Sequence, residues 1–239
     1  MKKMISRLSL AMALLLGAGA AFAQERITGN GDVKKEVRDV TGFSGIAIGG
    51  SGHVYLVQGN TESVQIEAES NLLPYIVSDV EDHNLSIHYK KGYNLKTNKP
   101  INIYVTVKNI DYIGASGGVS VAATEGIKTD RLKIDASGSL RLNMKLEAKS
   151  LDAQFSGSVE ARITGTLEEA RYDISGSANV SAPGLQTASA DIIISGSGDL
   201  DLAVAKDLDV SISGSGKVHY KGSPTITKHI SGSGRIYND

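Results

Sequence analysis

The chain has no cysteine and no tryptophan, and its 239 residues include only three phenylalanines and four prolines. Without cysteine it forms no disulfide bonds, so its stability must come from buried apolar side chains and backbone hydrogen bonds. With so few aromatic residues, the core must be filled mainly by small aliphatic side chains. A chain of this length can bury enough apolar surface to fold as one domain.

Long apolar runs are also missing, apart from one at the start. A basic stretch at residues 2–7 precedes apolar Leu8–Leu16, and Ala21-Phe22-Ala23 follows as a small-residue cleavage signal. This order is typical of a secretory signal peptide, and the apolar run is too short to span a bilayer as a helix. We therefore predict a signal peptide over 1–23 and a mature protein exported to the periplasm, the outer-membrane surface or the medium. A lipoprotein would carry a cysteine at the cleavage point, and this chain contains none.

Neither sign of charge dominates. The chain has 25 basic and 26 acidic residues, and removing the three basic residues of the predicted signal leaves 22 against 26, a net charge of about −4. Nucleic-acid binding needs a basic face, so the sequence argues against a nucleic-acid partner. The sequence contains no phosphate-binding loop, dinucleotide fingerprint or zinc-protease motif. We expect a protein without catalytic residues, cofactor or metal.

What the sequence does contain is a recurring Ser-Gly motif, and eight of its copies define a repeat. These copies end at Gly52, Gly117, Gly138, Gly157, Gly176, Gly196, Gly214 and Gly232, and the spacings from Gly117 onward are 21, 19, 19, 20, 18 and 18 residues. A period near 19 is typical of stacked β-coils. The 65-residue gap before Gly117 corresponds to about three further periods in which the motif is lost.

Apolar and polar residues alternate on both sides of the motif. Around Gly138, the even positions hold Ile134, Ala136, Leu140 and Leu142, whereas the odd positions are polar or charged. Such alternation predicts strands with one buried face. Each repeat is therefore expected to be a strand, a Ser-Gly-Ser corner and a second strand. Glycine suits the corner because it adopts positive φ, and the serine hydroxyl can hydrogen-bond the turn backbone.

Two architectures fit this period, a parallel β-helix and an antiparallel barrel or sandwich built from hairpins. Stacking equivalent positions favours the β-helix, because two uniform columns result. The position two before the glycine gives an internal column of Ala115, Ala136, Phe155, Ile174, Ile194, Ile212 and Ile230. The position three after it gives an external column of Arg141, Glu160, Asn179, Asp199, Lys217 and Arg235. Several neighbours in this column have opposite charges, which favours adjacent strands. We predict an all-β, right-handed parallel β-helix.

The N-terminal half is less regular. We expect a polar segment or partial first coil over 24–41, followed by one β-helical domain over 42–239. Its coils are expected to be irregular to about residue 110 and regular afterwards. Residues 71–76 predict a short helical turn, and the lysine-rich stretch 92–100 predicts an exposed loop.

An ordered set of segments resembles the putative auto-transporter adhesin head domain, called the GIN domain. The segments are Phe43-Ser44-Gly45-Ile46, 50–59, 64–68, Asn71-Leu72-Leu73-Pro74-Tyr75-Ile76, Leu85-Ser86-Ile87 and the Ser-Gly repeats. The resemblance covers about 42–237. It implies an exported bacterial protein with a β-helical fold and an adhesin role, and it brings no catalytic residues.

Three short motifs are explained better by the repeat structure than by catalysis or metal binding. Gly114-Ala115-Ser116-Gly117-Gly118 matches the nucleophile elbow of hydrolases, but that motif needs a following helix and a strand is predicted here. Ser-Gly-Asp199-Leu200-Asp201 resembles one unit of a calcium-binding repeat, which needs an aspartate in every coil. His83 and His88 would point to opposite sides of one strand and make a poor metal pair.

The outward polar face of the strand after each corner is the best candidate for binding. We name as its ligand face Asn179, Asp199, Asp201, Lys217 and His219. A flat polar ladder can hold a glycan or an envelope protein, although such charges also serve to keep a long sheet soluble. The leading hypothesis is an exported binding, adhesion or envelope protein without catalytic activity. The alternative is a carbohydrate-active enzyme, either a lyase or a hydrolase, using the only plausible cluster, Asp199, Asp201 and Lys217.

The last coil ends two residues before the C-terminus, and no amphipathic cap follows it. An open coil exposes a strand edge and a cross-section of the core. We therefore expect this end to pack against another copy of the chain or a partner.

Overall fold

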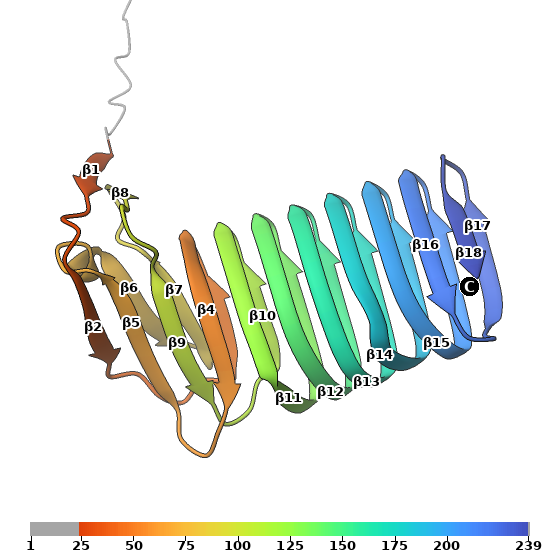
Figure 1. Ribbon diagram of the computed structural model, residues 1–239, viewed down its shortest axis with the longest axis horizontal. Coiled ribbons are helices and arrows are strands. Elements are labelled where there is room, and N and C mark those ends of the chain that lie inside the picture. Colours follow the sequence, from red (N-terminus) through yellow and green to blue (C-terminus); the bar gives the residue numbers. More distant parts are fainter. Residues whose placement is uncertain (1–23, 239) are drawn as a thin grey trace, which may run out of the picture.

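The regular part of the molecule is a stack of coils, each built from one long strand that bends around the edge of the stack (Figure 1). This computed structural model describes residues 24–238, and the predicted signal peptide lies outside them. The five long strands are β11 (Gly118–Ala136), β12 (Ser139–Phe155), β13 (Ser158–Ile174), β14 (Ser177–Ile194) and β15 (Ser197–Ile212). Each pairs in parallel with the next. The predicted parallel β-helix of about seven turns is therefore confirmed.

Each long strand contributes to two faces of the solenoid. The start of β11 pairs with β4 (Ser51–Gln58), and its end pairs with β10 (Tyr112–Ala115). We call the face built after the corners the leading face and the face built before them the trailing face. The leading face ends in β16 (Ser215–Lys221) and β18 (Arg235–Asn238). The trailing face runs from β3 (Gly45–Ile48) through β10 to β17 (Thr225–Ile230).

Both predicted columns are confirmed by the strand register. The internal column runs unbroken from Ala115 to Ile230, and each member is paired with the next. The external column runs from Arg141 to Arg235 in the same way. Because side chains alternate between the two sides of a strand, this register points one column inward and the other outward. The inward column is buried from Ala115 to Ile212.

The motif glycines are required for close approach between coils and not for a special backbone conformation. A Cβ atom on Gly157 would lie 1.8 Å from the carbonyl oxygen of Gly138, and the same clash recurs at the other corners. None of these glycines has positive φ, so the expected reason for glycine here is wrong. Positive φ occurs instead at glycines of the opposite edge, such as Gly165 and Gly222.

The corners are held together by the backbone. In the Gly176 corner, the N–H groups of Ser175 and Gly176 both donate to the Phe155 carbonyl, at 3.0 and 3.1 Å, and Ser177 N–H donates to the Gly157 carbonyl. The inter-coil ladder therefore continues through the bend. The serine side chains contribute less than expected: among the described residues, only Ser156 has a hydroxyl that bonds the preceding corner, at 3.4 Å.

Core volume is kept constant by complementary side chains. Along the internal column, alanine at 115 and 136 gives way to isoleucine at 194 and 212. The position two after each glycine changes in the opposite direction, through Val119, Leu140, Val159, Ala178, Gly198 and Gly216. A Cβ on Gly216 would lie 2.9 Å from the Ile194 side chain. Close packing of the core thus explains why these later positions are glycine.

The N-terminal part departs from a simple stack. β7 (Asn84–Tyr89) and β9 (Asn102–Val107) form a coil that lies outside β3 and β4, although it comes later in the sequence. Antiparallel strands flank it: β6 (Ile76–Glu81) pairs with β7, and β5 (Ser63–Glu69) pairs with β9 and with β2 (Val33–Arg38). The expectation of three further motif-less periods is therefore wrong. Ser51-Gly52 is also out of register, because the glycine that stacks under Gly117 is Gly50.

Two smaller elements complete this part. The 3-10 helix η1 (Leu73–Tyr75) confirms the predicted turn. β8 (Tyr93–Lys96) pairs in parallel with β1 (Glu25–Thr28), so the expectation that 92–100 is only a loop is wrong. Residues 92–100 alone do not predict this pairing, because a two-stranded pair of this kind depends on the distant partner. Within residues 24–238, no helix is long and apolar enough to cross a membrane.

Candidate binding face

The outer side of the leading face carries two parallel rows of polar side chains. The first row is the external column. The second lies two residues further along each strand and contains Tyr55, Ala122, Asn143, Arg162, Ser181, Asp201, His219 and Tyr237. Because successive coils pair in register, each row places one side chain per coil at the spacing of adjacent strands, about 4.8 Å.

Ion pairs link these rows along and across the coils. Glu160 accepts from Arg141 of the neighbouring coil, with 3.3 Å between Nε and Oε2, and its other oxygen lies 2.8 Å from Arg162. Lys217 Nζ lies 3.8 Å from Asp199 Oδ2. Both partners of this last pair are about 60% exposed, so water screens the pair and it adds little to stability.

The structure brings the five predicted ligand-face residues together. They line one hollow of about 670 Å³ near the C-terminal end of the leading face, with Tyr237 and Asn238 at its far side. His219 Nδ1 lies 3.6 Å from Asp201 Oδ1, and its ring meets Tyr237 edge to face at 6.3 Å between centroids. The hollow thus combines donors, acceptors and an aromatic ring, which is the chemistry of a site for a hydroxyl-rich or polar ligand.

A larger groove lies beside the first row and was missed by the sequence analysis. It measures about 1130 Å³ and runs along the leading face from β4 to the last corner. Its repeating wall is the serine that follows each glycine: Ser139, Ser158, Ser177, Ser197, Ser215 and Ser233. The recurrence of serine at this position was visible in the sequence, but the depth of the groove was not.

One end of the groove is bounded by residues 97–101, which come from the connection between β8 and β9. The buried carboxylate of Glu69 fixes this connection by accepting the backbone N–H groups of Asn98, Lys99 and Gly31. Burial acts to raise the pKa of Glu69, but these backbone hydrogen bonds outweigh it and lower the pKa. Glu69 therefore stays ionised at neutral pH and positions the wall.

An aromatic cluster lies at the same end. The rings of Tyr55 and Tyr104 stack at 5.1 Å with an interplanar angle of 15°, and Lys35 Nζ lies 4.7 Å from the Tyr104 centroid. Lys35 also pairs with Glu67 at 3.0 Å. Hydrogen bonding to Lys35 is the main cause of the lowered pKa of Glu67, and the same bond raises the pKa of Lys35.

The trailing face has its own, smaller hollow. It measures about 490 Å³ and lies beside the serine that precedes each glycine, including Ser137, Ser156 and Ser175. Tyr112 and Asp135 line it, and Lys133 pairs with Asp135 at 3.0 Å. Burial, assisted by Asp135, raises the pKa of the Tyr112 hydroxyl. The two sides of the Ser-Gly-Ser corners at Gly138, Gly157 and Gly176 thus open onto different surfaces.

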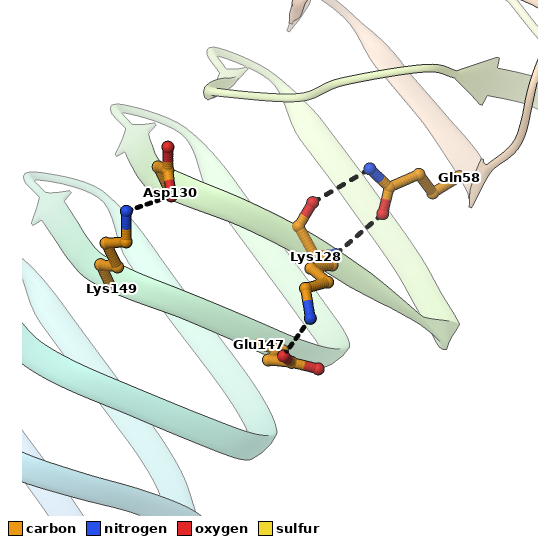
Figure 2. A network of polar contacts seen from close by, with 5 residues as sticks. All are labelled: Gln58, Lys128, Asp130, Glu147 and Lys149. Carbon is orange, nitrogen blue, oxygen red and sulfur yellow. Dashed lines mark hydrogen bonds and ion pairs between the residues drawn. The ribbon is translucent and has the colours of Figure 1, made fainter.

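The edge opposite the corners is occupied by a structural network (Figure 2). The Gln58 side chain accepts from the backbone N–H of Lys128 at 2.8 Å and donates to its carbonyl at 3.0 Å. Its amide thereby makes the two hydrogen bonds that a backbone amide would make if β4 continued beyond Gln58. Lys128 also contacts Glu147, and Lys149 contacts Asp130 at 2.7 Å. These contacts join successive coils.

The structure gives no support to the hydrolase-elbow match or to a metal site among the described residues. Ser116 lies in the corner between β10 and β11, and a strand follows it, so the hydrolase-elbow geometry is absent there. Across residues 24–238, no three histidine, aspartate or glutamate side chains come together in a way that would hold a metal ion.

The family is shown by comparison with known proteins. The family described as "Putative auto-transporter adhesin, head GIN domain" matches residues 42–224. The chain belongs to this GIN-domain family. No curated protein matches it.

Solved structures share the fold of this GIN-domain chain. A putative adhesin from Bacteroides fragilis is 25% identical, with a TM-score of 0.82 over 89% of this chain and all of the other. A putative adhesin from Parabacteroides merdae (22% identical, 90% of this chain and 99% of the other) and a putative lipid binding protein from Parabacteroides distasonis (24%, 90% and 100%) both give a TM-score of 0.67. These last two likenesses support the fold alone.

Proposed function

We propose that this GIN-domain protein is an exported binding protein of the cell envelope that works without catalysis. Its binding surface is the leading face, centred on Asn179, Asp199, Asp201, Lys217 and His219. The observation that carries the proposal is the convergence of these five side chains, from three successive coils, on one open hollow. The adhesin names of the family and of the Bacteroides fragilis structure agree with this role.

The exposure of the charged residues supports binding over catalysis. A catalytic acid or base usually needs a partly dry site that shifts its pKa. Asp199 and Lys217 are instead well solvated and neutralise each other across neighbouring coils. A solvated ladder of this kind suits reversible contacts with a polar surface.

The proposal is tested with purified protein 24–239 on a glycan array and in pull-downs from envelope fractions. We expect binding that is lost in the Asn179→Ala/Asp199→Ala/His219→Ala variant. The matched control is Gln154→Ala/Asp173→Ala/Ser211→Ala, which alters the corresponding outward positions of the trailing face. Circular dichroism verifies that both variants fold. No binding by the wild type, or equal loss in both variants, would contradict the proposal.

A second assay separates binding from catalysis. The wild-type protein is incubated with the polysaccharides that it binds, and their chain length is followed. We expect no change in chain length. Cleavage that disappears in the Asp199→Ala/Asp201→Ala/Lys217→Ala variant would show that the leading face belongs to a carbohydrate-active enzyme.

A further inference from the structure

We infer that the long groove of the leading face binds a linear β-1,4-linked polysaccharide lying along the solenoid axis, with about one sugar per coil. This inference rests on the proposed function and assigns a ligand class to the binding surface. It concerns the groove lined by the serines after each glycine, which shares Asn179, Asp199 and Lys217 with the predicted ligand face.

The shape of the groove calls for a long ligand. It crosses every coil from β4 to the last corner, so a compact small molecule would occupy only part of it. Each coil except that of β11, where Gly118 replaces the serine, presents the same pair of groups, one serine hydroxyl and one side chain that points outward two residues later. A polymer with a regular repeat can make recurring contacts along the groove, and its affinity then grows with the number of repeats. In a β-1,4-linked chain successive sugars are turned by about half a turn, so the same contacts return at every second coil.

The spacing of the coils selects the polymer. Neighbouring strands lie about 4.8 Å apart, which is close to the advance per sugar of an extended β-1,4-linked glycan. An extended peptide advances only about 3.3 Å per residue and falls out of register within a few coils. A glycan therefore matches the array where a peptide does not.

The charges of the wall favour an uncharged or weakly charged chain. Along the external column the signs change from Arg141 to Glu160, then from Asp199 to Lys217, and these neighbours pair with one another. A polyanion would need an uninterrupted basic row. Serine hydroxyls and an asparagine amide, in contrast, offer the donors and acceptors that sugar hydroxyls require.

An aromatic platform lies at the N-terminal end of the same face. Tyr55 is 42% exposed and stands in its row between Tyr104 and Ala122. One face of its ring is stacked on Tyr104, while the next position of the row holds only a methyl group. This leaves room for a sugar ring beside Tyr55, since the apolar face of a sugar packs well on an aromatic ring. His53, in the adjacent row of the same strand, lines the groove.

The inference is tested by titrating purified 24–239 with defined cello- and chito-oligosaccharides of two to eight sugars. We expect the Kd to fall by about tenfold or more from the disaccharide to the hexasaccharide and then to level off. Tyr55→Ala should weaken binding of the hexasaccharide more than that of the disaccharide, because at one sugar per coil a disaccharide cannot reach from Ser139 on β12 across β11 to the platform on β4.

A matched pair of variants locates the chain. Ser177 and Ser175 flank Gly176 and are both exposed, but Ser177 lines the groove and Ser175 lines the trailing-face hollow. We expect Ser177→Gln to weaken oligosaccharide binding at least about tenfold and Ser175→Gln to leave it unchanged. Equal effects of the two variants, or affinity independent of chain length, would overturn the inference.

The outcomes separate this inference from the proposed function. Oligosaccharides that do not bind, together with an envelope protein captured through the leading face, would overturn the glycan assignment and leave the binding role intact. Failure of every envelope glycan and protein to bind would overturn both.

Discussion

At the scale of single residues, the fold depends on glycines that let one backbone touch the next. From Gly138 onward, each motif glycine lies over the carbonyl oxygen of its predecessor, and there is no room for even one additional carbon. The corner is therefore a stacking contact. Glycine recurs at it from coil to coil because the two backbones lie too close together for a side chain. Such a contact can tolerate substitution only by moving two coils apart.

Gly157→Ala should lower the free energy of unfolding by more than about 2 kcal/mol, because the new methyl group overlaps backbone that has no rotamer to change. Gly118→Ala is the matched control. Gly118 stands where the other coils have serine, and the nearest atom to its added Cβ is the Ser51 side chain at 3.3 Å. Denaturant unfolding measures both. Equal losses would show that the stacking contact does not set the stability.

Tyr172 is the one tyrosine of the described residues that is completely buried, and its hydroxyl has no hydrogen-bond partner. Burial raises the pKa of this hydroxyl, which stays neutral at all physiological pH values. Because an unsatisfied buried hydroxyl is unfavourable, Tyr172→Phe should stabilise the protein by about 1 kcal/mol. A clear loss of stability in urea unfolding would instead reveal a bound water or another partner for the hydroxyl.

The residue columns were predictable because the repeat supplies them. A fixed period and a fixed alternation place Ala136 under Phe155 and Arg141 beside Glu160 without knowledge of the rest of the fold. The role of the motif glycines was not predictable, because the sequence does not reveal how closely two backbones approach. The coincidence of Ser51-Gly52 with the motif was misleading for the same reason.

At the scale of elements, the connection 97–101 bounds one end of the groove. It follows β8 and reaches the end of the groove only because Glu69, on β5, binds its backbone. This is why the groove could not be predicted: its end wall comes from a distant segment, and the strand order β3, β7 and β4, β9 inverts the order of the chain. The antiparallel pairs in this part do not follow the repeat, so the sequence pattern does not predict them.

Glu69→Gln should destabilise the protein at neutral pH, because the neutral amide binds the three backbone N–H groups less strongly than the carboxylate does. The pKa of Glu69 is lowered in the folded state, so its contribution is present above the unfolded pKa of about 4.3 and is lost as the pH falls through the lower folded value. The stability difference between wild type and variant should therefore be largest at pH 7 and shrink toward pH 3.

Denaturant unfolding at several pH values checks this, with Glu125→Gln as the control for an exposed carboxyl at the opposite edge. Oligosaccharide binding by Glu69→Gln at pH 7 shows whether weaker hydrogen bonds from this side chain disturb the groove wall formed by residues 97–101. A stability difference between wild type and variant that grows as the pH falls would contradict the expected role of the Glu69 carboxylate.

At the scale of the whole molecule, charged residues turn inward at both ends of the solenoid. At the N-terminal end, Lys34, Glu36 and Arg38 of β2 face the side on which β5 buries Ile66 and Val64. At the C-terminal end, Lys228 of β17 occupies the column that holds Ile192 and Val210 in earlier coils. Inward charges on a terminal strand discourage pairing with further strands.

The expected packing of the C-terminal coil against another copy stays a prediction, and Lys228 opposes it. Ile226 and Ile230 are 37% and 41% exposed on the same strand, so the apolar surface that the expectation requires does exist. Burying the ammonium group of Lys228 beside them without a partner is costly. The strand register is needed to see that the central inward residue of β17 is charged.

Lys228→Ile should make the end of the solenoid self-associating, with a dimer dissociation constant lower than that of the wild type by about tenfold or more. Lys228→Gln, which keeps a polar group, should change association much less. Light scattering over a range of concentrations checks both. A wild type that is already a tight dimer, or a Lys228→Ile variant that remains monomeric, would show that this residue does not guard the end.

The leading face of the solenoid is proposed to bind the ligand, and the trailing face is not. The absence of cysteine allows a direct test, since a single introduced thiol is the only one in the protein. Ser158→Cys places it in the groove of the leading face, and Asp173→Cys places it in the hollow of the trailing face. The measurement is the rate of maleimide labelling of each variant with and without envelope polysaccharide. Slower labelling at position 158 alone is the predicted result, and protection at position 173 alone, or at neither position, would contradict the account.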